Sequence, residues 1–279
     1  MKNLKLAAVC LSCLTMTGCS ALNFSVEGLI NAPKLTSEQS EIHQALIESV
    51  GSNITLKYPK NGEYRSAYVI ANIDDEPTDE AMVFYEYTSN GSEEDGLRVN
   101  ILDKDEDGKW YSVKELAGAG TDIDQVIISP MGSNNQTDVF VGYQNLTNDE
   151  KTMEIYSYTD GDFKRVALDT YSVLEPLDIN NDGYIELITI QRSTNNDTGA
   201  VTAKASMLNM KNNEITRGEN VDMCDNVTSY VSSKTGMLDS GRRAIFIDGL
   251  TADGKLQTEI IYYRYSGLQN PMQLRSEKL

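Results

Sequence analysis

The sequence predicts an all-β protein: a β-propeller-like array of about four four-stranded blades that follows one short helix. Three observations predict it. Short runs rich in β-branched and aromatic residues recur from residue 53 onward, and turn residues separate them. A loop with regularly spaced oxygen-bearing side chains precedes several of these runs, at intervals of roughly 50 residues, which is typical of propeller blades. The composition, with 15 Tyr and 40% apolar residues, suits strands with one wet face and a packed core.

Residues 1–18 are predicted to be a lipoprotein signal peptide. Lys2 and Lys5 precede the apolar run Leu6–Leu14, which is too short to span a bilayer. The following Met16-Thr17-Gly18-Cys19 resembles a bacterial lipobox, which implies that Cys19 carries lipid such as palmitate and anchors the protein at the extracytoplasmic face of the bacterial cell membrane. An ordinary signal peptide cut near Gly18 is the alternative.

Residues 19–35 are predicted to form a tether, and residues 36–52 a short helix. Thr36 suits the N-cap, Gln39 completes a capping box, and Gly51 suits the stop. One helical face is apolar and carries Ile42, Ala45, Leu46 and Val50. We therefore expect this helix to lie against the main domain.

Residues 53–279 are predicted to form the β-propeller-like domain. The expected strands are Ala67–Ile73, Ala81–Tyr87, Leu97–Leu102, Trp110–Leu116, Gln125–Ile128, Val139–Tyr143, Thr152–Tyr158, Phe163–Leu168, Ser172–Leu177, Leu187–Ile190, Val201–Leu208, Val227–Val231, Ala244–Ile247 and Thr258–Tyr265. Asp107-Gly108, Asp160-Gly161 and Asp253-Gly254 are typical of hairpin turns. We expect Ile54–Tyr58 to pair with the last blade and close the ring, or else the array to be a shortened form of a larger one.

The segment Asp178–Glu186 has the side-chain pattern of a calcium loop. Oxygen-bearing side chains stand at positions 1, 3, 5 and 9, namely Asp178, Asn180, Asp182 and Glu186. A glycine at position 6 permits a sharp turn, and the backbone carbonyl of Tyr184 can fill a remaining position. An EF-hand is excluded because its last ligand comes at position 12 and a helix follows, whereas a β-rich run follows here. A solvated turn without metal is the alternative.

This loop resembles the D-x-D-x-D-G-x-x-E/D loop of FG-GAP and VCBS repeats in integrin-α-like β-propellers. The resemblance implies that the loop links two strands of a blade and that Asp178, Asn180, Asp182 and Glu186 bind Ca²⁺. It also implies a protein or a glycan as the ligand, because members of this family usually bind one or the other.

Further copies of the loop are predicted, with decayed ligand sets. The second keeps oxygen at all four positions but has Pro77 in place of the glycine; its residues are Asn72, Asp74, Glu76 and Glu80. The third, 130–138, keeps only Asn134 and Asp138 as side-chain ligands, and a fourth, ending near Arg243, has lost the set. The similar segment Asp103–Tyr111 is interpreted as a hairpin turn.

The remaining composition favours a binding or scaffolding role without catalysis. A net charge of −18 disfavours nucleic acid as a partner. His43, the only His, falls outside the apolar helix face and is expected to be solvated, and no G-x-S-x-G, zinc or nucleotide motif is present. Two alternatives stay open. One is a glycoside hydrolase or polysaccharide lyase, which predicts perturbed carboxylates in the central channel. The other is a subunit of an envelope complex.

Overall fold

The computed structural model describes residues 35–74, 76–88, 96–130, 137–145, 150–194, 197, 199–211, 214–218, 220–225 and 227–271. The predicted signal peptide, Cys19 and nearly all of the tether lie outside these residues. Within them, no helix has both the length and the apolar character needed to cross a membrane. The described chain is all-β apart from one helix, as predicted.

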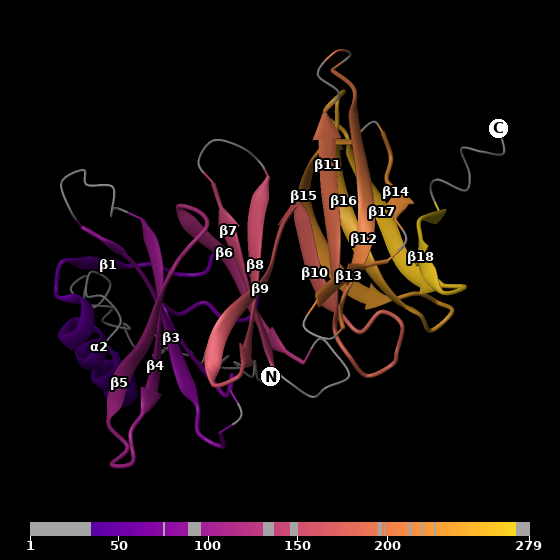
Figure 1. Ribbon diagram of the computed structural model, residues 1–279. Coiled ribbons are helices and arrows are strands. Elements are labelled where there is room, and N and C mark those ends of the chain that lie inside the picture. The colour runs from indigo at the N-terminus through magenta and orange to yellow at the C-terminus, as the bar shows by residue number, and fades with distance from the viewer. Residues whose placement is uncertain are drawn as a thin grey trace, which may run out of the picture.

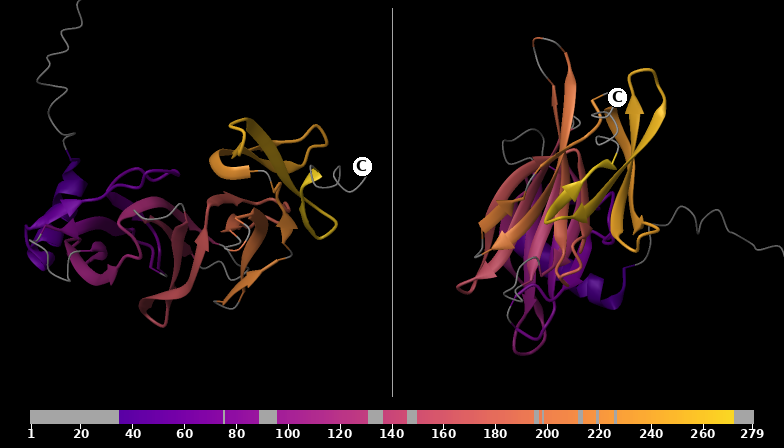
Figure 2. Two further views of the ribbon diagram at one scale, coloured as in Figure 1. Left: turned by 90° about the horizontal axis from the view of Figure 1, so that it is seen from above. Right: turned by 90° about the vertical axis from the view of Figure 1, so that its right-hand side faces the viewer.

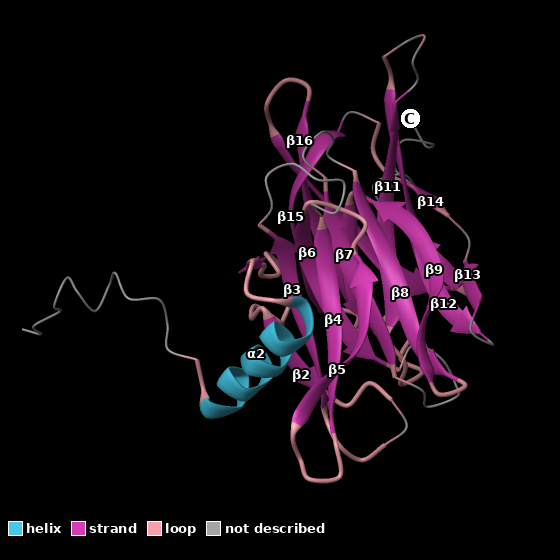
Figure 3. Ribbon diagram, turned by 60° about the vertical axis from the view of Figure 1, so that its left-hand side comes forward, coloured by secondary structure: helices cyan, strands magenta, loops and turns pink. Residues whose placement is uncertain are grey.

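The helix, α2 (Ser37–Val50), begins as its sequence predicts. The Thr36 side chain accepts a hydrogen bond from the Gln39 backbone N–H at 3.1 Å, and the Gln39 side chain accepts one from the Thr36 N–H at 3.1 Å. This capping box satisfies two backbone donors that a helix start leaves unpaired. Ile42 and Leu46 are completely buried against the first sheet, which orients the helix across it (Figure 3).

The strands form four antiparallel sheets in chain order, which we name A to D. Sheet A holds β1 (Ile54–Leu56), β2 (Tyr68–Ala71), β3 (Glu80–Tyr87), β4 (Leu97–Lys104) and β5 (Trp110–Ala117). Sheet B holds β6 (Asp122–Ser129), β7 (Asp138–Gln144), β8 (Lys151–Thr159) and β9 (Asp162–Tyr171). Sheet C holds β10 (Val173–Leu177), β11 (Glu186–Thr194), β12 (Val201–Lys211), β13 (Glu214–Arg217) and β14 (Val221–Asp222). Sheet D holds β15 (Val227–Met237), β16 (Arg243–Thr251), β17 (Leu256–Arg264) and β18 (Gly267–Gln269).

Each sheet is four strands wide. In sheet A, β1 and β2 share one edge of β3, and in sheet C, β13 and β14 share one edge of β12. All the strands expected from the sequence are present. The three Asp-Gly pairs lie in hairpin turns, where Gly108, Gly161 and Gly254 adopt positive φ. These residue pairs therefore set the register of the hairpins.

The strands β3, β7 and β11 are buried on both faces along most of their length, which explains their continuous apolar sequences. In β3, Met82 and Phe84 face sheet B, whereas Val83 and Tyr85 face the helix. Similar clusters join sheet B to sheet C around Phe140, Met153 and Leu187, and sheet C to sheet D around Ile190, Ile245 and Ile261. Four cores thus hold the helix and the sheets together in chain order.

The sheets follow one another along a curved array, with sheet A and sheet D at its two ends (Figures 1 and 2). No hydrophobic cluster of the described residues joins these two sheets. The expectation that Ile54–Tyr58 closes a ring is wrong, because Ile54–Leu56 pairs with β3 of its own sheet. The face of sheet A that points away from sheet B is covered by the helix instead.

Candidate functional site

The predicted loops precede the same strand in successive sheets, although most of the third loop, 130–138, lies outside the described residues. The loop joins β2 to β3 in sheet A, β6 to β7 in sheet B, β10 to β11 in sheet C and β15 to β16 in sheet D. The strand after the loop, which we call the second strand, opens with Glu80, Asp138, Glu186 and Arg243 in sheets A to D, respectively. The repeat found in the sequence, including its decayed fourth copy, therefore corresponds to a repeated structural position.

The loop Asp178–Glu186 wraps its backbone around its own side-chain oxygens. Asp178 Oδ1 accepts from the Asp182 N–H at 3.0 Å, and Oδ2 accepts from the Gly183 N–H at 3.3 Å. Asp182 Oδ1 accepts from the Tyr184 N–H at 2.9 Å. Gly183 has a φ of 95°, a conformation that disfavours residues with a Cβ. The glycine thus permits the turn that brings these oxygens to one side.

Glu186 closes the loop from the start of β11. Its Oε2 accepts from the Ile179 N–H at 3.1 Å, and the side chain is buried. Burial raises the pKa of Glu186 to about 7, and the negative charges of Asp182 and Asp178 add to this rise. The amide nitrogen of Asn180 lies 2.9 Å from Glu186 Oε1 and 3.0 Å from Asp182 Oδ2. It therefore donates hydrogen bonds where two acidic side chains approach each other.

A cationic side chain from the next sheet also reaches the loop. Arg243 Nη1 lies 2.8 Å from the Asp178 carbonyl oxygen and 3.0 Å from Asp178 Oδ2. Arg243 opens β16, so it holds in sheet D the place that Glu186 holds in sheet C. This contact cannot be read from the sequence, where its one signal is that the fourth repeat has Arg at the position at which the others have an acid.

The donor set fits a hard cation. Within the described residues, no three acidic, His or Cys side chains converge tightly enough to hold a metal as they stand. The reason is visible in the contacts: the Asn180 nitrogen separates Asp182 from Glu186, and Arg243 holds Asp178. Rotating the Asn180 amide by half a turn would place oxygen where nitrogen is. Three carboxylates and one amide oxygen are ligands that Ca²⁺ prefers.

The second loop, 72–80, shares part of this geometry. Glu80 Oε2 accepts from the Ile73 N–H at 2.8 Å, and burial raises the pKa of Glu80 to about 7, as in the loop of sheet C. Asn72, however, donates its amide to the carbonyl oxygens of Glu76 at 2.6 Å and Thr78 at 3.1 Å. The Asn72 side chain thereby ties the loop to itself and offers nitrogen where Asp178 offers oxygen.

The other sequence-predicted positions are not brought together into a site. Asn134 and Cys19 lie outside the described residues. Asp138 is buried and accepts a hydrogen bond from the Ser157 hydroxyl. His43 is half-buried, and its Nδ1 lies 2.8 Å from the Tyr68 hydroxyl, so the expectation of a solvated side chain is wrong. Cys224 is a free thiol.

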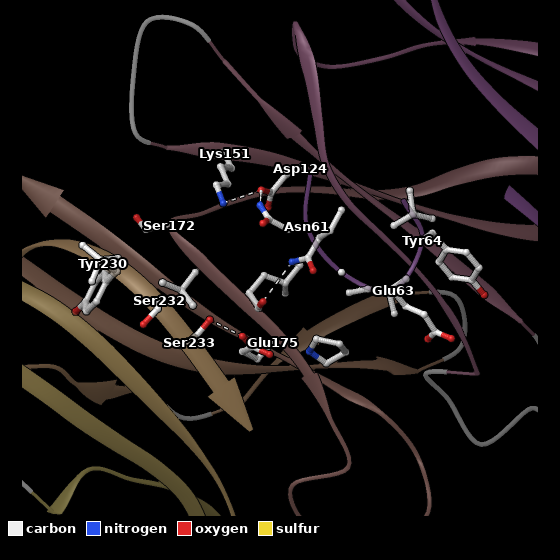
Figure 4. Close-up of a pocket in the computed structure, with 18 of the residues that line it drawn as sticks. Asn61, Glu63, Tyr64, Asp124, Lys151, Ser172, Glu175, Tyr230, Ser232 and Ser233 are labelled. Atoms are coloured by element: carbon white, nitrogen blue, oxygen red, sulfur yellow. Dashed lines mark hydrogen bonds and ion pairs between the residues drawn. The ribbon is translucent and has the colours of Figure 1, made fainter. Parts of the chain in front are cut away.

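A cavity of about 530 Å³ lies where β6, β10 and β15, the first strands of sheets B to D, meet the segment 61–64 (Figure 4). Asp124 and Glu175 are among its lining residues. Burial raises the pKa of Glu175. Asp124 is almost fully buried, and its two oxygens accept hydrogen bonds from three side chains. A carboxylate so engaged is poorly placed to attack a sugar or to activate water.

No protein-family model matches this chain, and no curated protein matches it.

Proposed function

We propose that this protein is a calcium-stabilised binding or scaffolding lipoprotein without catalytic activity, held by lipid on Cys19 at the extracytoplasmic face of a bacterial membrane. The sheets act as blades of an open β-propeller-like array. Ca²⁺ would be held by Asp178, Asn180, Asp182 and Glu186, with the Tyr184 carbonyl as a further ligand. When bound, the ion would neutralise the acidic loop and fix the start of β11.

The observation that carries this proposal is the oxygen-rich corner Asp178–Glu186. It keeps its glycine at positive φ and three carboxylates, while the corresponding corner in sheet A is closed by Asn72. The lipobox-like end of the apolar N-terminal run supports the location. The formal net charge of −18 also suits a cation-binding protein.

The test is a calcium titration followed by thermal unfolding. A cation that binds only the folded state stabilises it by about 2.7 kcal/mol at 100 times its Kd. For a chain of this size we expect a rise in Tm of roughly 5–10 °C. Asp182→Ala should abolish the rise, whereas the control Asp107→Ala, in the look-alike hairpin, should retain it. A wild-type Tm that changes with neither calcium nor chelator would contradict the proposed calcium site.

The enzyme alternative is favoured by one observation, the half-buried Glu175 in the cavity, whose raised pKa suits a general acid. Glycoside hydrolysis needs a second carboxylate at a set distance from the first. Asp124 is engaged by three side chains, and the remaining acid of the lining, Glu63, is exposed to solvent, which disfavours this alternative. Release of reducing sugar from glycans by the purified protein, lost in Glu175→Gln, would decide for the enzyme.

A further inference from the structure

The cavity between sheets B, C and D is held by side-chain bonds that cross from one sheet to the next. Asn61, in the connection between β1 and β2, donates to Asp124 of sheet B at 2.8 Å. Gln125 of sheet B donates to the Leu174 carbonyl of sheet C at 3.2 Å. Ser233 of sheet D donates to Glu175 of sheet C, as Figure 4 shows. Sheets B, C and D and the connection between β1 and β2 thus build the walls, and these bonds fix the shape of the cavity before any ligand enters.

The wall on the side of sheet B contains an ion pair between the buried Asp124 and the half-buried Lys151. Lys151 Nζ lies 2.8 Å from Asp124 Oδ1, and the Tyr171 hydroxyl donates to Asp124 Oδ2 at 2.6 Å. A Cβ on Gly142 would overlap the Tyr171 hydroxyl, so this contact needs glycine there. Buried ion pairs add little net stability compared with apolar packing. The arrangement is better explained by the position it gives to Lys151 at the cavity.

The charges around the cavity select against anions. The charge of Lys151 is matched by that of Asp124, which leaves Glu63 and Glu175 as surplus acidic groups in the lining. Burial raises the pKa of Glu175. An anionic ligand would be repelled by the two surplus carboxylates.

The remaining polar groups can both donate and accept hydrogen bonds. Ser172 contributes a hydroxyl, the Ser233 hydroxyl can still accept beyond the bond that it gives to Glu175, and Asn61 has an amide hydrogen and an oxygen beyond the bond that it gives to Asp124. Tyr64 and Tyr230 are also among the lining residues, with side chains packed against the apolar clusters between neighbouring sheets. The hydroxyls of a sugar likewise donate and accept. The volume lies within the range of ordinary small-ligand sites.

From these walls, charges and hydroxyls, we infer that the cavity binds an uncharged mono- or disaccharide through Asn61, Ser172, Ser233 and Glu175. The inference rests on the proposed role of the protein as a binding lipoprotein and names a ligand class for it. We expect the sugar to be held and not cleaved, because Asp124 is tied to Asn61, Lys151 and Tyr171, and the other acid beside Glu175, Glu63, is exposed to solvent.

The test is saturation-transfer NMR on the full chain with glucose, galactose, mannose, N-acetylglucosamine and cellobiose. N-acetylneuraminic acid and spermidine serve as anionic and cationic probes. We expect saturation transfer to at least one uncharged sugar and to neither charged probe. Asn61→Ala and Glu175→Gln should each weaken the binding about tenfold, the loss of one hydrogen bond worth ~1.4 kcal/mol. Glu106→Gln, in the distant β4–β5 hairpin, should bind as the wild type does.

Three results would overturn the inference: no transfer to any sugar in the panel, binding of a charged probe in place of sugar, or binding that both cavity variants leave unchanged. Cleavage of cellobiose would overturn the claim that the site only binds. The calcium-dependent Tm of each variant, measured in parallel, reports on folding and on the metal loop. If calcium raises the Tm but no sugar binds, only the proposed sugar site is refuted. If a sugar binds but calcium does not change the Tm, only the proposed calcium site is refuted.

Discussion

The corners of sheet A and sheet C are built on one plan but differ in what fills them. In both, the acid that opens the second strand accepts a backbone N–H from the second loop residue, at 2.8 Å for Glu80 and 3.1 Å for Glu186. In both, burial raises the pKa of that acid to about 7. They differ at the first position: Asn72 donates to loop carbonyls, whereas Asp178 accepts from loop amides.

An amide nitrogen at the first position satisfies the loop of sheet A from within, and β3 still begins at the residue that corresponds to the start of β11. In sheet C the first residue is an acid, and Arg243 compensates part of its charge. The first position therefore presents a donor to the loop in sheet A and an acceptor in sheet C.

The largest effect is expected from making the loop of sheet C like that of sheet A. Asp178→Asn replaces an acceptor by a side chain that also donates, and it removes the carboxylate that pairs with the Arg243 guanidinium. We expect the whole calcium-dependent gain in stability to disappear, about 2.7 kcal/mol at 100 times the wild-type Kd. Chemical unfolding with calcium and with chelator measures it. Asp74→Asn, an Asp-to-Asn change at the third position of the sheet A loop, is the control. An equal loss of the calcium-dependent stability in that variant would contradict the assignment of the site to sheet C.

A smaller effect on stability is expected from a change at Glu80, whose carboxylate has no cationic side chain beside it among the described residues. A carboxyl with a folded pKa of about 7 and an ordinary unfolded pKa is bound to a proton more strongly in the folded state. Its contribution to stability is therefore full below about pH 4.5 and is lost as the pH rises through about 7. Glu80→Gln should stabilise the protein at about pH 8 by on the order of 2 kcal/mol and change little at about pH 4.

Urea unfolding at both pH values measures the effect of Glu80→Gln. The gain should be the same with calcium and with chelator, because Glu80 lies outside the proposed metal loop. Glu186→Gln is the matched variant, and it should lower the calcium response. A gain for Glu80→Gln that appears equally at low pH would show that a better hydrogen bond, and not the removal of a buried charge, is responsible.

The sequence was sufficient for the strands, the capped helix and the repeated corner. All of these depend on local information: period-two patterns, Asp-Gly turns, a capping box, and acids at fixed spacing. The partner of each sheet face depends on the rest of the chain. Ile54–Leu56 is apolar enough to pair with any open edge, and only the position of β3 beside it decides which one.

The candidate sites were predictable to different degrees. The oxygen pattern of Asp178–Glu186 is continuous in the sequence, so its residues were found. The contact from Arg243 joins residues 65 positions apart, and Asn61 and Lys151 approach Asp124 from 63 and 27 positions away. No periodicity marks such contacts. In particular, the cavity arises from the packing of three sheets and has no counterpart in any single stretch of the chain.

The smallest effect is expected at Arg243, which tests whether the guanidinium competes with the cation. Its charge lies 3.0 Å from Asp178 Oδ2, one of the proposed ligand atoms, and it is partly exposed to solvent. Arg243→Gln keeps a donor for the Asp178 carbonyl but removes the charge. We expect calcium to bind several-fold more tightly, since like charges near a solvated surface repel by about 1 kcal/mol, and the calcium-free protein to lose up to ~1 kcal/mol of stability. Calorimetric titration measures the affinity, with Arg242→Gln as the neighbouring control. Weaker calcium binding in Arg243→Gln would mean that the arginine holds Asp178 in place for the ion and does not compete with it.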